Sequence, residues 1–279
     1  MKNKVYVVGN PIKHSKSPLI HNYWIKKYSI DAIYQKLKID EEEIKNLIDN
    51  LRKSKILGFN VTIPFKKKLL EYVDILDPSA YKSKAINTVY KSGRKIIGCN
   101  TDGTGFINSL EKDLKYSIPD QCNIFLIGSG GAAFGIISSL IELNPKTIEI
   151  VNRTESSALT LINHFKKISP KIKFKLRSWG SLPHKNVDIV INSTSCGMKQ
   201  NDKVFTKLET LPNKTFVYDI IYNPAKTSLI MQAEELKLRH SNGVYMLIRQ
   251  AAESFEKWFN VSLTDSDIKE VIDLIGNKL

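Results

Sequence analysis

Short apolar runs alternate with amphipathic segments along most of the chain. Residues 5–8 and 124–127 form continuous apolar runs that end at a glycine, which is typical of strands buried on both faces. Residues 40–53 and 265–275 instead space their apolar side chains as one face of a helix. Strands are predicted at 5–8, 34–39, 59–63, 85–90, 123–127, 147–151, 187–192 and, as the last strand, 216–221. Helices are predicted from about 18, at 40–53, from about 67 to just before 77, from about 103 to 116, from the glycine turn at 128 to 143, at 245–258 and at 265–275.

This alternation predicts an α/β protein of two domains. The first hundred residues alternate strand and helix, as a domain with a mostly parallel sheet does. A second strand–turn–helix unit opens after the Pro119–Asp120 turn. The last two helices have no strand of their own, so we expect them to return to the first domain. The predicted domains are 1–103 with 244–279, and 104–243.

A glycine-rich turn follows the strand at 123–127 and precedes an apolar helix. Its sequence is Gly128-Ser129-Gly130-Gly131-Ala132-Ala133. Glycines in this position allow a tight turn and let a pyrophosphate approach the helix N-terminus. Because strand, turn and helix occur in the required order, the sequence predicts a Rossmann-type dinucleotide-binding domain.

The end of the next strand indicates which dinucleotide is bound. An NAD site places an acidic residue there, on the ribose hydroxyls. This chain has Asn152, Arg153 and Thr154 instead. A guanidinium suits a phosphate, which favours NADP(H) as the cofactor. The alternative for Arg153 is a solvated loop arginine. The ends of the two later strands are expected to line the same crevice, with Ser193, Thr194, Met198 and Ile220.

Two further strand ends carry a lysine and an aspartate. Lys66 lies just past the strand at 59–63, which Pro64 ends, and Asp102 follows an apolar run at 95–98. Such a pair can share a pocket and a proton, as the acid or base of a reaction. The alternatives are a surface lysine and a helix-capping aspartate.

Polar side chains at two other places are candidate ligand contacts. Ser15 and Ser17 lie near the predicted start of a helix, where their hydroxyls can hold a carboxylate. The alternative is that Ser15 is a turn residue and Ser17 is the N-cap of the helix. Asn87 interrupts the predicted strand at 85–90, as a satisfied buried amide or a ligand contact.

Composition narrows the class of protein. Hydrophobic residues make up 42% and charged residues 25%, as in globular proteins. The net charge of +14 fits anionic small-molecule ligands, and without an RNA-binding aromatic motif we expect no nucleic-acid partner. The three cysteines show no CxxC pairing and no metal-ligand spacing, which predicts a reduced compartment and no metal site. No segment is long and apolar enough for a signal peptide or a membrane helix, so we expect a soluble, cytoplasmic protein.

Taken in order, these motifs resemble the shikimate dehydrogenase family. The resemblance rests on residues 9–11, 14–18, 60–66, 85–88, 100–103, 152–154 and 219–222, with Gly243 and Gln250. It implies NADPH-dependent reduction of 3-dehydroshikimate to shikimate, reversibly, in aromatic amino-acid biosynthesis, by a monomer or homodimer.

The resemblance also implies roles for individual residues. Lys66 and Asp102 would be the catalytic pair. Ser15 and Ser17, with Tyr222, would hold the substrate carboxylate. The partners of the ring hydroxyls would be Asn60, Thr62, Asn87, Asp102 and Gln250, and the cofactor-binding residues would be Gly128, Ser129, Gly130, Gly131, Ala132, Asn152, Arg153, Thr154, Ser193, Thr194, Met198, Ile220 and Gly243.

One departure from the family pattern narrows the expected preference for NADP. Many members carry a second basic residue a few positions after the Asn-Arg-Thr motif, whereas this chain has Glu155-Ser156-Ser157. Losing one charged hydrogen-bond partner costs ~1.5–3 kcal/mol of discrimination. A quinate/shikimate dehydrogenase that uses NAD or NADP is therefore the rival enzyme. A ligand sensor on the same fold is the non-enzyme alternative, which an intact Lys66 and Asp102 argue against.

Overall fold

The computed structural model describes residues 2–199, 202 and 207–276. The chain folds into two compact units. The first comprises Met1–Gly105 and Leu247–Leu274, and the second comprises Phe106–Met246 and the end of the chain from Ile275. The sequence placed the same divisions at 103 and 243. The last two helices lie mainly in the first unit.

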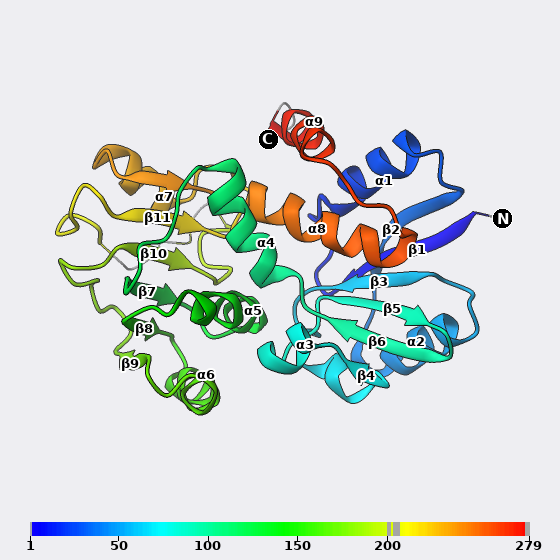
Figure 1. Ribbon diagram of the computed structural model, residues 1–279, viewed down its shortest axis with the longest axis horizontal. Coiled ribbons are helices and arrows are strands. Elements are labelled where there is room, and N and C mark those ends of the chain that lie inside the picture. The colour runs from blue at the N-terminus through cyan, green and yellow to red at the C-terminus, as the bar shows by residue number, and fades with distance from the viewer. Residues whose placement is uncertain (1, 200–201, 203–206, 277–279) are drawn as a thin grey trace. The chain divides into compact units, whose positions relative to one another are not determined.

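The first unit is built on a six-stranded mixed sheet with the strand order β2-β1-β3-β5-β6-β4 (Figure 1). Strand β1 pairs in parallel with β2 and β3, and β4 pairs in parallel with β6, whereas β5 runs antiparallel to β3 and β6. The strands are β1 (Asn3–Gly9), β2 (Ala32–Lys38), β3 (Gly58–Val61), β4 (Ile75–Leu76), β5 (Thr88–Ser92) and β6 (Lys95–Cys99).

Helices of the first unit bury one apolar face each. In α2, residues Ile44, Leu47, Ile48 and Leu51 recur at helical spacing and are buried in one cluster with sheet residues such as Phe59. The helical segments are α1 (Ser17–Lys27), η1 (Glu41–Glu43), α2 (Ile44–Arg52), η2 (Lys68–Glu71), α3 (Pro78–Ser83), α4 (Asp102–Asn108), α8 (Val244–Phe259) and α9 (Asp265–Gly276); α4 and α8 each continue across a division between the units.

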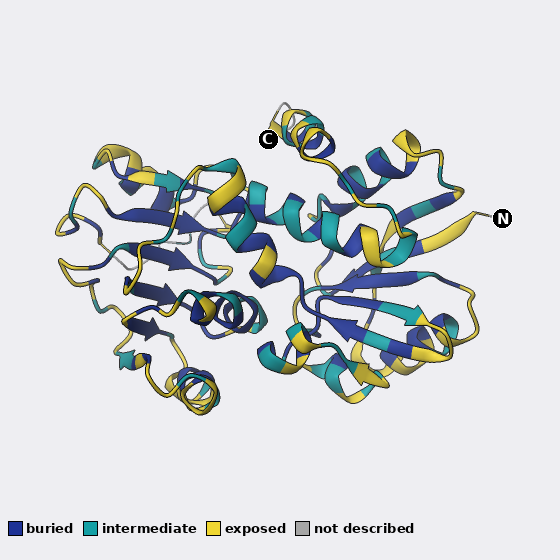
Figure 2. Cartoon of the chain, viewed as in Figure 1, coloured by how far each residue is buried: buried dark blue, intermediate teal, exposed yellow. Residues whose placement is uncertain are grey.

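The second unit contains a six-stranded, all-parallel sheet with the order β12-β11-β10-β7-β8-β9. This is the strand order of doubly wound dinucleotide-binding sheets, with the switch point between β7 and β10. Figure 2 shows its central strands as buried. The elements are η3 (Ser109–Asp113), β7 (Asn123–Ile127), α5 (Gly131–Leu140), η4 (Ile141–Leu143), β8 (Thr147–Val151), α6 (Glu155–Ile168), β9 (Lys173–Arg177), β10 (Ile189–Asn192), β11 (Phe216–Asp219), α7 (Ser228–Glu235) and β12 (Arg239–Ser241).

Several predicted elements are wrong in detail. The helix expected from 67 to 76 is only the short η2, because the Asp74 amide bonds to the Ile96 carbonyl and leads the chain into edge strand β4. Asp77 and Pro78 are not a turn after a helix but the start of α3, where Asp77 accepts the Ala80 amide as N-cap. The strand expected at 85–90 begins only at Thr88, and the strand at 216–221 is not the last, since β12 follows.

Candidate active site

The first unit brings Lys66 and Asp102 together. Lys66 Nζ lies 2.5 Å from Asp102 Oδ2, with the side chains 14% and 7% exposed. Strand β3 ends at Val61, and the backbone then turns so that Phe65 enters the core and the Lys66 carbonyl accepts the Ile86 amide at 2.7 Å. The lysine is therefore held at the end of the strand, as its sequence position predicts, and is still reachable from solvent.

Asp102 is oriented by two asparagines. Asn87 Nδ2 donates to Asp102 Oδ1 at 3.0 Å, and the Asp102 amide donates to Asn100 Oδ1 at 2.9 Å. One carboxylate oxygen is thus held by Asn87, and the other faces Lys66. This arrangement gives Asp102 more than the capping role that the sequence left open, although Asp102 also begins α4.

Asn87 also connects the pair to helix α8. Asn87 Nδ2 lies 3.3 Å from Gln250 Oε1 and 2.9 Å from Thr101 Oγ1, and Thr101 Oγ1 donates to the Gln250 carbonyl at 3.0 Å. The structure therefore brings together Lys66, Asp102, Asn87 and Gln250, four of the residues predicted from sequence. Thr101 was not predicted, although it stands beside Asp102 in the same motif.

Asn60 lies deeper, within the core of the first unit. Its Oδ1 accepts the Tyr34 hydroxyl at 2.6 Å, and its Nδ2 lies 3.0 Å from both Thr88 Oγ1 and Ser254 Oγ. These contacts engage both polar atoms of the amide and fix it between β3 and α8. Ser254 was also missed by the sequence reasoning, although its position four residues after Gln250 puts both side chains on one helix face.

Ser15 and Ser17 stand at the start of α1. The Ser17 amide lies 3.3 Å from Ser15 Oγ. Ser17 is the first helical residue; Lys16 holds the N-cap position, and no side-chain cap bond is made there within the described part of the chain. The N-cap alternative for Ser17 is therefore wrong. Both serines therefore stand at the N-terminus of α1, where an anion is favoured.

The glycine turn of the second unit fits a dinucleotide. Gly128 has φ +111°, which favours glycine, and a Cβ there would lie 2.6 Å from Ser193 Oγ. Gly130 precedes α5, and a Cβ on it would meet nothing within 4 Å. The N-cap of α5 is Gly130 itself, and no side chain among the described residues caps the first amides of the helix. A pyrophosphate satisfies such amides.

Arg153 follows the end of β8, and this strand end lies next to the strand end that leads into the glycine turn. Val151 pairs with Ile127, the residue before Gly128, so the two strand ends are adjacent. Asn152 Nδ2 donates to the Thr154 carbonyl at 2.8 Å, which shapes the short segment between β8 and α6, and Arg153 is exposed. The residues present therefore fit an NADP ribose phosphate, with Glu155 already in the helix that follows.

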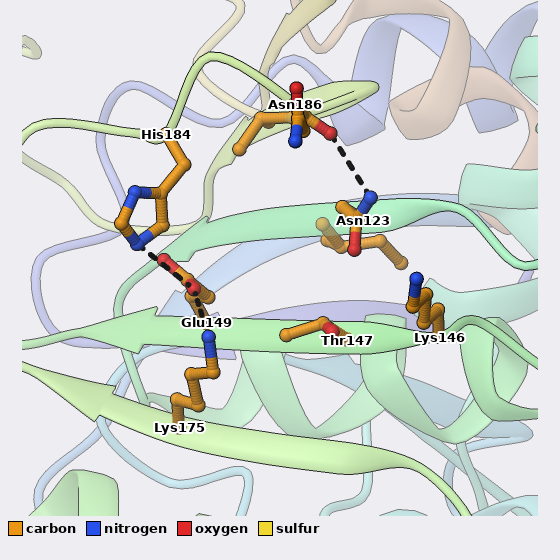
Figure 3. A pocket seen from close by; sticks show the side chains of 9 residues that line it. Asn123, Lys146, Thr147, Glu149, Lys175, His184 and Asn186 are labelled. Atoms are coloured by element: carbon orange, nitrogen blue, oxygen red, sulfur yellow. Dashed lines mark hydrogen bonds and ion pairs between the residues drawn. The ribbon is translucent and has the colours of Figure 1, made fainter.

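A separate pocket of about 180 Å³ lies at the opposite end of β7 and β8 (Figure 3). There the buried carboxylate of Glu149 lies 3.1 Å from Lys175 Nζ and 3.4 Å from His184 Nε2. None of the predicted site residues is in its lining. The ammonium group of Lys175 compensates the buried charge, so the pocket is explained as a structural ion-pair cluster.

Three observations bear on the other expectations from composition. None of Cys99, Cys122 and Cys196 is part of a disulfide. Among the described residues, no group of His, Cys, Asp and Glu side chains is arranged to hold a metal ion. Within that same part of the chain, no helix has the length and hydropathy needed to cross a membrane.

Fold and sites together define a two-domain α/β oxidoreductase with a dinucleotide-binding domain of the Rossmann type. Residues 7–89 match the family described as the shikimate dehydrogenase substrate binding domain, and residues 112–225 match the family described as shikimate/quinate 5-dehydrogenase. The chain belongs to the shikimate dehydrogenase family, whose curated members found here are NADP-dependent enzymes. The predicted family, fold class, enzyme class and cofactor are confirmed.

Individual relatives match over nearly the whole chain. The shikimate dehydrogenase (NADP(+)) of Pelagibacter ubique is 40% identical over 275 residues, which is 98% of this chain and 100% of that one. A crystal structure of a shikimate dehydrogenase in complex with NADP+ is 33% identical, with a TM-score of 0.88 and coverage of 98% and 96%. The shikimate 5-dehydrogenase of Listeria monocytogenes, in complex with shikimate and NAD, is 28% identical, with a TM-score of 0.84 and coverage of 97% and 96%.

Proposed function

We propose that this chain reduces 3-dehydroshikimate to shikimate with NADPH, reversibly, in aromatic amino-acid biosynthesis. The observation that carries the proposal is the pairing of Lys66 with Asp102 in a chain of this family. The pair is within reach of solvent and is held by Asn87. A sensor without catalysis has no need for such a pair.

In this mechanism Lys66 Nζ is the proton donor to the carbonyl oxygen that becomes a hydroxyl, and it takes the proton back in the reverse reaction. Asp102 holds the ammonium group in place through Oδ2, while Asn87 holds Oδ1. When bound, NADPH supplies the hydride. The work of the protein is to hold the substrate and to move one proton at a defined atom.

The remaining site residues hold the substrate and the dinucleotide. Ser15 and Ser17 bind the substrate carboxylate at the start of α1, with Tyr222 as a further partner. The partners of the ring hydroxyls are Asn60, Thr62, Asn87 and Gln250, with Asn60 oriented by Tyr34. The dinucleotide is held by Gly128, Ser129, Gly130, Gly131, Ala132, Asn152, Arg153, Thr154, Ser193, Thr194, Met198, Ile220 and Gly243. A cytoplasmic monomer or homodimer is proposed from the sequence.

A broader quinate/shikimate dehydrogenase that also uses NAD is the second candidate. Two observations favour it: no basic residue stands at 155–157, and the similar Listeria protein was crystallised with NAD. Both candidates use the same Lys66 and Asp102, so they differ in cofactor and substrate range only.

Substitution of the lysine tests the catalytic assignment. Lys66→Ala is expected to lower kcat about a hundredfold or more, with a much smaller change in the KM of the substrate, because proton transfer is made in the transition state. Lys68→Ala is the matched control, since Lys68 makes a surface ion pair with Glu41 at 3.0 Å. A Lys66→Ala enzyme with unchanged kcat and a raised KM would contradict the assignment.

A further inference from the structure

The loops that follow β10 and β11 are joined by a buried carboxylate. Asp219, the last residue of β11, is fully buried. Its Oδ1 accepts the Asn192 side-chain amide and the Ile221 backbone amide, each at 3.0 Å. Its Oδ2 accepts the Thr227 hydroxyl at 2.7 Å. One side chain thus fixes the end of β10, the backbone after β11 and the start of α7.

Asn192 extends this network into the next loop. Asn192 Oδ1 accepts both the backbone amide of Thr194, at 3.1 Å, and its hydroxyl, at 2.7 Å. The Thr194 hydroxyl in turn accepts the Cys196 amide at 3.0 Å. Asp219 fixes the side-chain amide group of Asn192, so it also determines where the opposite end of that amide holds residues 194–196.

These loops also touch the glycine turn and the segment after β12. Ser193 Oγ donates to the Ile127 carbonyl at 2.7 Å, just before Gly128. A Cβ on Gly243 would lie 1.9 Å from the Ile220 carbonyl oxygen, so only glycine fits there. The segments that follow β7, β10, β11 and β12 therefore contact one another. A displacement of the backbone at Ile220 or Thr194 is expected to displace the neighbouring segments as well.

Asp219 has no salt-bridge partner within the described residues, so hydrogen bonds alone compensate its burial. Burial raises the pKa of Asp219 to about 6. Keeping an unpaired carboxylate inside a domain is costly, and a well-packed neutral residue avoids that cost. A fully hydrogen-bonded buried network does, however, specify one arrangement of the backbone around it.

In a doubly wound sheet, each half binds one mononucleotide, and β10, β11 and β12 belong to the half that does not carry the Arg153 segment. From this geometry we infer that Asp219 is a positioning residue for the nicotinamide half of the dinucleotide, acting through Asn192 and the backbone of residues 194–196 and 220–221. The inference rests on the proposed function, since it presumes that this unit binds NADP(H).

Binding of two probes separates this role from general stability. NADPH carries both halves of the cofactor, whereas adenosine 2′,5′-bisphosphate carries only the adenine half with its 2′-phosphate. The variants are Asp219→Asn, Thr227→Val and Thr227→Ser, in the full chain. Asp188→Asn is the control, because Asp188 stands at the amino end of β10, where it accepts the Asn123 amide at 2.9 Å and pairs with Lys214.

Asp219→Asn is expected to raise the Kd of NADPH about tenfold and to leave the Kd of adenosine 2′,5′-bisphosphate within about twofold. The NH2 group of the asparagine replaces one carboxylate oxygen, so it faces either the Thr227 hydroxyl or the Asn192 and Ile221 amides, and the network loses an acceptor. Thr227→Val shows the same selective loss in a milder form, and Thr227→Ser, which keeps the hydroxyl, restores NADPH binding. Asp188→Asn leaves both constants unchanged.

Equal weakening of both probes by Asp219→Asn would overturn the inference, and so would unchanged NADPH binding. If Asp219→Asn does not fold, the contrast between Thr227→Val and Thr227→Ser decides the question alone. Failure of the proposed function looks different: the wild-type chain then binds NADPH but turns over no 3-dehydroshikimate, and the selective effect of Asp219→Asn on binding is still measurable.

Discussion

His21 is a buried, neutral imidazole in the aromatic core of the first unit. Its ring stacks on Tyr34 with centroids 4.1 Å apart, and it also contacts Trp24 and Trp258. Burial lowers the pKa of His21 to about 3. Since Tyr34 orients Asn60, the protonation of His21 would disturb a proposed substrate residue as well as the core.

This histidine makes the first unit sensitive to acid. Its folded pKa lies below the unfolded value of 6.5, so the unfolded chain binds the extra proton and stability falls as the pH drops from about 6.5 toward 3. His21→Phe keeps an aromatic ring against Tyr34 and removes this proton. The difference in the free energy of unfolding between the variant and the wild type is expected to shift in favour of the variant by about 1.4 kcal/mol for each pH unit below 6.5. Urea unfolding between pH 4 and 8 measures it, and a pH-independent difference would refute it.

Arg153 is expected to select NADP through its contact with the 2′-phosphate. Arg153→Ala should raise the KM of NADPH about tenfold and leave that of NADH nearly unchanged, because a charged hydrogen bond contributes on the order of 1.5 kcal/mol or more. Lys173→Ala, an exposed cation at the far end of β9, serves as the control for net charge. If both cofactors suffer alike, Arg153 has a structural role instead.

At the scale of residues, contacts between side chains could be predicted from the sequence only where both residues follow the ends of strands. Lys66 and Asp102 follow such ends, and the structure places them 2.5 Å apart, while their catalytic role stays a prediction. The hydrogen-bond partners of Asn60 could not be predicted from the sequence, because Ser254 comes 194 residues later, on α8. Asp219 stood in a quoted motif, but its contacts depend on how β10 and β11 pair.

At the scale of elements, α9 is attached to α1 through Asp267. Thr264 caps α9, with the Asp267 amide donating to Thr264 Oγ1 at 3.2 Å. The Asp267 carboxylate lies 2.8 Å from Lys27 Nζ and accepts the Tyr28 hydroxyl at 2.9 Å. Burial raises the pKa of Asp267, but hydrogen bonds from Lys27, Thr264 and Tyr28 outweigh it, so the pKa is lowered overall.

Asp267→Asn is expected to lower the free energy of unfolding by about 2 kcal/mol at neutral pH, since it removes the ion pair and weakens the cap. Because the folded pKa is below the unfolded one, this contribution is present above about pH 4 and is lost as the pH falls further. Asp273→Asn, at an exposed position of the same helix, is the control. Equal stability of the two variants in urea at pH 7 would contradict the proposed attachment.

Element predictions succeeded where one apolar run made the strand. Strands β7 and β8 occupy the predicted residues because the apolar run 124–127 and the side chains of Ile148, Ile150 and Val151 are buried in the sheet. Strand β12, with Arg239–Ser241, has no apolar run and becomes a strand only by pairing with β11. The missed α6 did carry a helical pattern, with Ala158, Leu161, Ile162 and Phe165 on its buried face.

At the scale of the whole molecule, the chain forms two compact units, and each carries one of the two sets of proposed ligand-binding residues. The first unit holds the Lys66–Asp102 pair, and the second holds the glycine turn and the Arg153 segment. The similarity to shikimate dehydrogenases covers 98% of the chain, so it includes both units. The net charge of +14 fits a protein whose proposed ligands are a carboxylate and a dinucleotide phosphate.

Initial rates of NADPH and NADH oxidation with 3-dehydroshikimate, and of NADP+ and NAD+ reduction with shikimate and with quinate, test the central claim most directly. The account predicts turnover of 3-dehydroshikimate with NADPH, turnover of shikimate with NADP+, and far lower rates with NADH, with NAD+ or with quinate. Comparable rates with NADH or quinate would support the broader quinate/shikimate dehydrogenase. Folded protein without turnover of any pair would contradict the enzyme assignment itself.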